Sequence, residues 1–335
     1  YTLKSIDLSA YVGQNIYIAF HVVDHDGGAV WIDDVSGVSL FVPSCPKPTG
    51  LAASNLTATS VDATWTAGGA ESSWQYLYGT TGFTPDWSLA TEATTASASL
   101  PGLNPNTSYD LLVRAYCSGE EQSDPAKTTF RTECAALQIT ASTTYTYGFE
   151  DATVGSYSNN YADFIPCWGK VNNSTSSYAS YKAYPYACAT DPHLGNNCVY
   201  FSAANYTDSP SEQILVFPEV ANDVQTLALS FWAKMSSSDY SGALQLGVMT
   251  DPTDPTTFTK VGQDISLTTT YTLYEFDFTT YAGEGHYVAI RCPRPTSSSY
   301  QSIYVDDVVL SLIPPCRPLK SVSVSDITRT SLRVN

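Results

Sequence analysis

Acidic residues around a glycine turn are the first part of this sequence that could do chemistry. Asp24 and Asp26 precede Gly27, and Asp33 and Asp34 follow downstream. Carboxylate oxygens held in a loop are ligands that Ca²⁺ prefers. The loop lacks the later Glu of an EF-hand, and Asp and Gly are also ordinary turn residues. We therefore favour a simple turn here, with a calcium loop as the alternative.

Catalytic signatures are weak throughout the chain. The four histidines, His21, His25, His193 and His286, stand outside any HExxH motif, and no GxSxG sequence is present. These motifs hold a metal or a nucleophile in a fixed geometry. The sequence therefore predicts a protein that is not an enzyme.

Aromatic side chains offer a different chemistry, the stacking of sugar rings or protein surfaces. Trp232 follows Phe231 in the segment LSFWAKM, so one of them faces the core and the other faces outward. A Tyr-rich stretch at 178–190 contains Tyr181, Tyr184 and Tyr186. Exposed aromatic rings of this kind form binding surfaces. For Trp232 we favour core packing over ligand binding, and for the tyrosines a merely solubilising loop is an equal alternative.

Composition indicates the kind of protein that positions these groups. Charged residues make up only 14% of the chain, the net charge is −17, and Tyr, Thr and Ser are abundant. Such a composition suits strands and polar loops, and the negative charge argues against nucleic-acid partners. No apolar run is long enough for a membrane-spanning helix. The eight cysteines form no CxxC pattern, which favours disulfides and a secreted or outer-surface location.

The chain repeats itself. Three segments recur in the same order: 1–22 as 271–292, 30–35 as 303–308, and 43–63 as 314–334. In these pairs Tyr1 corresponds to Tyr271 and Cys45 to Cys316. The offset is close to 271 in every block, so we expect a repeat unit of about that length. The sequence then looks like a window of a longer array of tandem copies.

The small part of the unit reads as seven short strands separated by turns. Trp65 lies on the second strand, and LNPNTSYDLLVRAY contains Leu103 and Tyr109 in the pattern of a tyrosine corner. With Tyr76 on the third strand, these residues resemble the core of a fibronectin type III domain. The resemblance implies a spacer or presenting module, with a Cys45–Cys117 bridge that joins its start to its sixth strand.

The large part contains at least eight strand-like runs and no helical pattern, which indicates a jelly-roll sandwich. Its segments GFEDATVGSY, FIPCWGKVN, LSFWAKM, HYVAIRCP and IYVDDVVL occur in this order. They resemble the MAM-like jelly rolls, and more closely the cleaved-adhesin or choice-of-anchor domains of Bacteroidetes surface proteins. The resemblance implies a structural calcium site at Glu150, Asp306 and Asp307, with a solvent-exposed acidic strand end as an equal alternative. Because Asp306 and Asp307 are adjacent on a strand, we expect them to point to opposite faces.

The remaining cysteines allow several pairings. We expect Cys134–Cys167 at the junction of the two parts, and Cys188–Cys198 as a staple of the Tyr-rich stretch. Cys292 has Val22 as its counterpart in the repeat, so we expect a free thiol there. Cys316 corresponds to Cys45 and would pair in a further copy of the small domain.

The predicted fold class is all-β, a tandem of fibronectin-like and jelly-roll sandwiches. We expect the last strands of a jelly roll at 1–42, a fibronectin type III domain at 43–134, a jelly-roll domain at 135–313, and the first strands of a second fibronectin domain at 314–335. The predicted function is a non-catalytic segment of a secreted bacterial adhesin or surface filament that binds protein or glycan on host or neighbouring cells. The alternative is an accessory region of a large secreted protease or glycan-degrading enzyme.

Overall fold

The computed structural model describes most of the two central parts of the chain. The described residues are 45–117, 121–156, 165–173, 184–206, 209–238, 242–295 and 300–314, with short pieces at 2, 4, 6–11, 16–21, 30–32, 324–325 and 333–334. The predicted sites at Asp24, Asp26 and Tyr181, and also Cys316, lie outside these residues. Among the described residues, the helices are single 3₁₀ turns, and none has the length or apolarity needed to cross a membrane.

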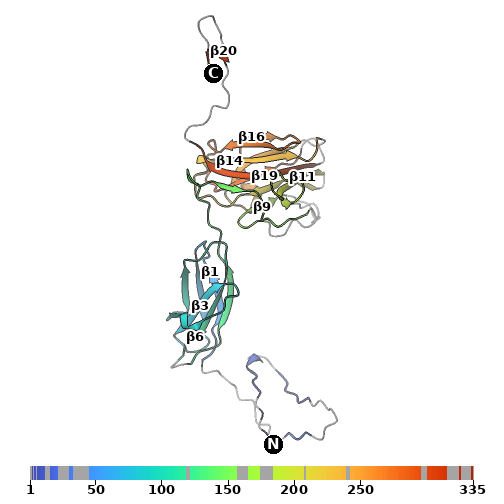
Figure 1. The fold of residues 1–335 in the computed structure, drawn as a ribbon. Coiled ribbons are helices and arrows are strands. Elements are labelled where there is room, and N and C mark those ends of the chain that lie inside the picture. The colour runs from blue at the N-terminus through green and yellow to red at the C-terminus, as the bar shows by residue number, and fades with distance from the viewer. Residues whose placement is uncertain are drawn as a thin grey trace. The chain divides into compact units, whose positions relative to one another are not determined.

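The structure is all-β, as the sequence predicts, and it divides into two compact units. The division falls between Thr132 and Glu133, although residues 57–59 and 104–106 group with the second unit. Each unit has its own sheets (Figure 1). Each also has its own hydrophobic core.

The small unit is a sandwich of one three-stranded and one four-stranded sheet. The first sheet has the order β1 (Thr49–Ser54), β2 (Ser60–Thr66), β5 (Ser97–Pro101). The second has the order β4 (Thr91–Ala93), β3 (Trp74–Thr80), β6 (Ser108–Ala115), β7 (Ala126–Arg131). All pairs are antiparallel. This arrangement of seven strands is that of a fibronectin type III sandwich.

The core of the small unit forms around two tryptophans. Trp65 on β2 meets Trp74 on β3 edge to face, with ring centroids 6.0 Å apart, and Tyr109 stacks on Phe130. Trp65 and Tyr109 are buried as predicted. On β3 the fully enclosed aromatic is Trp74, whereas the predicted Tyr76 only packs against the edge of the core.

The predicted Cys45–Cys117 disulfide is present, with Cα atoms 5.8 Å apart. It joins the segment before β1 to the residue that follows β6 by two positions. A covalent link therefore joins the start of the small unit to the end of its sixth strand.

The large unit is a sandwich of a seven-stranded and a five-stranded sheet. The first contains β10 (Tyr186–Cys188), β11 (Cys198–Tyr206), β19 (Tyr300–Leu312), β14 (Leu227–Met235) and β17 (Thr272–Asp277) in this order, with β12 (Ser209–Ser211) beside β11 and β8 (Tyr145–Tyr147) beside β19. The second has the order β16 (Thr259–Ser266), β15 (Ala243–Met249), β18 (Tyr287–Cys292), β13 (Gln213–Val216), β9 (Gly169–Asn172).

Alternation of apolar and polar residues places the core between these sheets. On β14, Leu229, Phe231 and Ala233 are buried, while the alternate residues Trp232 and Lys234 lie on the outer face. Phe231 and residues of the facing sheet, such as Leu246, belong to one cluster. Burying each such large side chain contributes about 1.5–3 kcal/mol.

The N-terminal segment differs from its repeated counterpart in the large unit. The described residues of 1–42 form one 3₁₀ turn at Ser9–Tyr11 and no strand, and Tyr17 and Trp31 are exposed. The jelly-roll strands expected at 1–42 stay a prediction. The equivalent residues Tyr287 and Tyr304 lie within β18 and β19, which pair with neighbouring strands on both sides. A strand forms only where such partners satisfy its backbone, and the described residues supply none for 1–42.

Near the C-terminus, β20 (Val324–Ser325) pairs with β21 (Arg333–Val334). The register, Val324 opposite Val334, matches that of Ala53 opposite Ala63 in the first hairpin of the small unit. The repeated sequence therefore forms the same local pairing twice.

Candidate functional site

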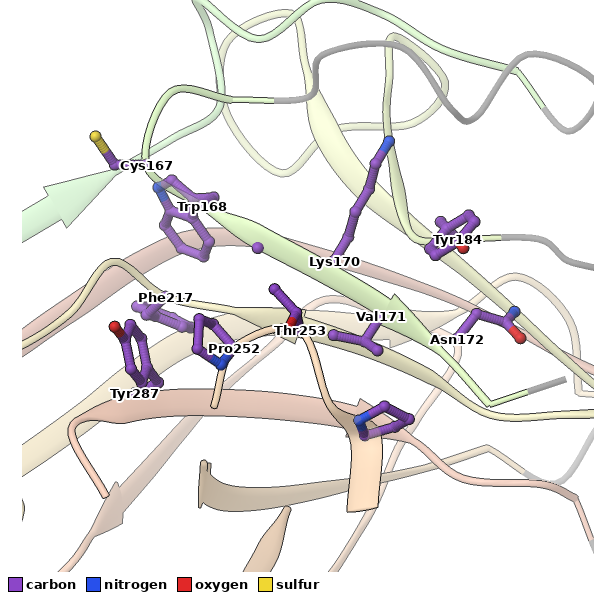
Figure 2. A pocket seen from close by; sticks show the side chains of 12 residues that line it. Cys167, Trp168, Lys170, Val171, Asn172, Tyr184, Phe217, Pro252, Thr253 and Tyr287 are labelled. Atoms are coloured by element: carbon purple, nitrogen blue, oxygen red, sulfur yellow. The ribbon is translucent and has the colours of Figure 1, made fainter. Parts of the chain in front are cut away.

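A cleft of about 460 Å³ opens beside the edge strand β9 of the large unit (Figure 2). It is lined by residues 167–172, by Tyr184, Phe217 and Tyr287, and by Pro252, Thr253 and Pro255. This volume lies in the range of small-molecule sites, which are mostly apolar with a few polar groups. We refer to it as the β9 cleft.

Aromatic rings form the inner end of the β9 cleft. Trp168 and Phe217 are buried, and their ring centroids lie 4.3 Å apart. The indole Nε1 of Trp168 donates a hydrogen bond to the hydroxyl of Tyr145 at 2.8 Å. The preceding residue, Cys167, is bonded to Cys134, as predicted. The indole ring is therefore fixed by its contact with the Phe217 ring, by a hydrogen bond and by the disulfide next to it in the chain.

Polar side chains form the opposite end of the cleft. Lys170 and Asn172 project from β9, and the ring of Tyr184 lies beside the lysine stem in Figure 2. The Lys170 Nζ atom is 5.9 Å from the centre of the Tyr184 ring. These groups supply a positive charge, an amide and a phenol to one side of the cleft, and all three residues are half-buried.

The third wall is a loop whose shape is set by two aspartates. Asp251 accepts hydrogen bonds from the backbone N and the hydroxyl of Thr253, at 2.8 and 2.7 Å. Asp254 caps the 3₁₀ turn η5 (Pro255–Thr257) by accepting from the backbone N of Thr256 at 2.9 Å. Such Asx turns fix the backbone locally, so the wall is formed in advance of any ligand.

A second cluster lies in the large unit where β8, β19 and the segment between β10 and β11 meet. It consists of Glu150, Asp306 and Asp307 with the segment 193–197, and we call it the acidic corner. Asp306 is fully buried, and its Oδ2 accepts from the backbone N of His193 at 2.8 Å. Its Oδ1 accepts from the N of Asp307, also at 2.8 Å. Burial is the main cause that raises the pKa of Asp306 to about 6.

The two adjacent aspartates do not point to opposite faces, contrary to expectation. Asp307 Oδ2 accepts from His193 Nδ1 at 2.7 Å, so both carboxylates contact the same histidine. In the pairing of β14 with β19, Ser230 lies opposite Val309 and Trp232 lies opposite Asp306, so the segment of β19 between these pairs is one residue longer than that of β14. Asp307 has a left-handed φ of 46°. This β-bulge adds one residue to β19 and re-aims the Asp307 side chain.

Glu150 reaches the same segment from the other side. Its carboxylate accepts from the backbone N of Asn196 at 2.9 Å and of Asn197 at 3.4 Å. Gly195 has a φ of 69°, and a Cβ there would collide with the Glu150 carboxylate. The turn after β8 and the last strand, β19, therefore hold one loop between them through acidic side chains.

The described residues contain no group of three or more His, Cys, Asp or Glu side chains placed to hold a metal. The oxygens of Glu150 and Asp306 are directed at N–H groups. Their chemistry is nevertheless that of calcium ligands, because all are carboxylate oxygens from separate segments.

Trp232 faces outward from β14, the orientation opposite to the core packing that we favoured. One face of its indole is stacked on His193, with centroids 4.0 Å apart and planes at 14°. Tyr186 lies on the same outer face in a row with Tyr200 and Tyr304, with neighbouring centroids 5.4 and 5.2 Å apart. Of the predicted binding residues that the structure describes, only Tyr184 lines the β9 cleft.

Cys188 and Cys198 are free in the structure, with sulfur atoms 3.2 Å apart. They flank the segment 189–197 and not the Tyr-rich stretch that we expected them to staple. Cys292 is a buried free thiol, as predicted.

Comparison with solved structures finds β-sandwich proteins. The K2 cleaved adhesin domain of Lys-gingipain is 13% identical, with a TM-score of 0.38, over 51% of this chain and all of that domain. The K1 cleaved adhesin domain of the same Porphyromonas gingivalis protein is 17% identical, with a TM-score of 0.38, over 51% of this chain and 99% of the domain. A structure of carbohydrate-binding modules from the β-sandwich superfamily is 13% identical in sequence, with a TM-score of 0.32. The match covers 79% of this chain and 98% of that one.

For the small unit, the FN5 domain of Drosophila Lar is 18% identical, with a TM-score of 0.23, over 27% of this chain and 99% of that domain. No protein-family model matches the chain, and no curated protein matches it. Identities and TM-scores this low carry no argument about family or ligand.

Proposed function

We propose that this chain is a non-catalytic adhesive segment of a secreted or surface-exposed bacterial protein, and that its large unit binds a glycan in the β9 cleft. The observation that supports this most is the composition of the cleft. Trp168, Phe217 and Tyr287 line the apolar end, while Lys170 and Asn172 supply donors at the other end. Sugars present apolar C–H faces and hydroxyl edges together, and this combination of groups complements both.

The fixed geometry of the cleft supports binding over a structural role. The loop wall is set by Asp251 and Asp254, and Trp168 is held by Phe217 and Tyr145. A site that is formed in advance spends little free energy on ordering side chains when a ligand binds. The two disulfides fit an oxidising, extracellular location.

The repeat extends the proposal to the ends of the chain. Residues 1–42 repeat the sequence of β17 to β19, and 314–335 repeat the start of the small unit. The shared register of β20–β21 and β1–β2 supports this correspondence. We therefore include tandem copies of the two domains, which would present several clefts to one surface and raise its avidity.

A glycan array with the full chain tests the proposed site. We expect binding to a restricted set of glycans, and a loss of at least about fivefold in affinity for Lys170→Ala and Tyr184→Ala, because each removes one contact worth about 1 kcal/mol. Lys260→Ala and Tyr78→Ala are matched controls, since Lys260 and Tyr78 are accessible residues outside the cleft. Absence of glycan binding, or equal losses in the controls, would remove the proposal.

Calcium at the acidic corner is a second part of the proposal. Glu150, Asp306 and Asp307 would supply carboxylate oxygens, and the ion would offset their mutual repulsion. The convergence of Glu150, from the turn after β8, and of Asp306 and Asp307, from β19, on one loop supports this. After EDTA treatment, added Ca²⁺ should raise the melting temperature above that of the metal-free protein. Mg²⁺ is the control ion. A midpoint that Ca²⁺ leaves unchanged would remove the metal from the proposal.

A further inference from the structure

We propose that Cys188 and Cys198 are a site of covalent modification, at which oxidation forms a third disulfide that locks the segment 189–197 onto the outer face of the large unit. The two residues are the last of β10 and the first of β11, and they lie directly opposite each other in the antiparallel pair. Opposite residues in such a pair have Cα atoms about 4.5–5.5 Å apart. Disulfides span that separation without movement of the backbone.

The sulfur atoms already face each other. They are 3.2 Å apart, and both lie near the carbonyl oxygen of Thr190, at 3.6 Å for Cys188 and 3.4 Å for Cys198. A hydrogen bond from the Cys198 thiol lowers the pKa of Cys188, and the same bond raises the pKa of Cys198. One sulfur of the pair is thus the better nucleophile and the other is its resolving partner.

The loop that the two cysteines close makes most of the contacts that cover the acidic corner. His193 stacks on Trp232 and binds Asp306 and Asp307, and Asn196 binds Glu150. The backbone carbonyl of Asp191 accepts from the hydroxyl of Tyr271 at 2.8 Å. A covalent link across the base of this loop would prevent these contacts from opening together.

The chemistry is a two-electron exchange with a low-molecular-weight disulfide of the oxidising compartment. The Cys188 thiolate attacks one sulfur of that disulfide and releases the first small thiolate, which leaves a mixed disulfide on Cys188. The Cys198 thiolate then attacks the Cys188 sulfur and releases the second. The two protons of the cysteine thiols go to the two released thiolates. Because both sulfurs are buried, the exchange requires the loop to open or takes place during folding.

Peptide mapping under non-reducing conditions tests the inference on the unaltered protein. After refolding in a glutathione redox buffer and blocking of free thiols, cleavage before Asp191 places Cys188 and Cys198 on different peptides. We expect these peptides to be linked, with a mass lower by two hydrogen atoms than the sum of the reduced peptides. The linked pairs Cys45–Cys117 and Cys134–Cys167 in the same digest are the positive controls. Finding both controls linked and both loop cysteines alkylated would overturn the inference.

The locking effect is tested with Cys188→Ala/Cys198→Ala, using Cys292→Ala as a control at a buried thiol outside the loop. For a bridge between residues ten apart, chain entropy predicts a fall of roughly 5–10 °C in the melting temperature of the large unit. Amide exchange at His193 and Asn196 should accelerate in the double variant alone. If reduction of the wild-type protein leaves exchange at these two amides unchanged, the bridge does not lock the loop.

Discussion

Replacing Cys45 and Cys117 together by alanine should remove a large share of the stability of the small unit. Their disulfide closes a loop between residues 72 apart in sequence. In the chain-entropy model, such a bridge stabilises the folded state by about 4.4 kcal/mol at 25 °C, because it restricts the unfolded chain. A unit of about 90 residues has a total stability of roughly 4–13 kcal/mol. The variant should therefore fold only marginally at 25 °C.

Differential scanning calorimetry of the full chain, together with tryptophan fluorescence from Trp65 and Trp74, would measure the effect. For a unit of this size, a loss of 4.4 kcal/mol corresponds to a fall of roughly 20–35 °C in melting temperature. The matched control is Cys134→Ala/Cys167→Ala, whose loop spans 33 residues and whose predicted loss, about 3.7 kcal/mol, belongs to the large unit. If the Cys45→Ala/Cys117→Ala variant loses less than about 1 kcal/mol of unfolding free energy relative to wild type, the chain-entropy argument for this bridge is refuted.

Three further changes probe single interactions. Asp110 is buried, and hydrogen bonds from Gly82, Lys127 and Thr129 lower its pKa to about 2. The ionised carboxylate therefore stabilises the fold above the unfolded-state pKa near 4, and this stabilisation is lost as the pH falls toward 2. Asp110→Asn should remove this part of the fall in unfolding free energy at acid pH. Gly195→Ala should lower the free energy of unfolding, measured in urea, by more than about 2 kcal/mol, because the new Cβ collides with a neighbour and the backbone is left-handed. The control Gly102→Ala has a φ of 75° and open space around it. It should lower the same free energy only by the left-handed strain, about 1 kcal/mol. Trp168→Ala should lower the free energy of unfolding by about 3–5 kcal/mol and abolish glycan binding. A Trp168→Ala protein that melts at the wild-type temperature and still binds glycan would contradict the cleft assignment.

The sequence predicts the architecture well because the relevant signals are local and periodic. Alternation on LSFWAKM and the corner at Leu103–Tyr109 depend on neighbouring residues, and the structure buries Phe231, Leu103 and Tyr109 accordingly. The Cys45–Cys117 bridge followed from the resemblance to a known sandwich, in which the first and sixth strands lie close together.

The candidate site was predicted less well, because its residues come together through long-range pairing. The orientation of Asp307 depends on a bulge opposite β14, and a period-two pattern cannot show an extra residue. Lys170 lies on β9, Phe217 directly after β13, and Tyr287 on β18, and nothing in their own segments marks them as neighbours. A signal did exist for the loop wall, since the DPTDPTT sequence at 251–257 contains two successive Asp turns.

The Cys134–Cys167 disulfide has a mechanical consequence. Tension applied to the chain ahead of Cys134 passes through the disulfide to Cys167 and so into β9, which begins two residues later. Strand β8 lies within the bypassed segment, so a pull does not load its pairing with β19. The residues between the two cysteines cannot add to the extension of the chain, and under force the large unit would open from β9 and its neighbour β13 while β8 stays in place.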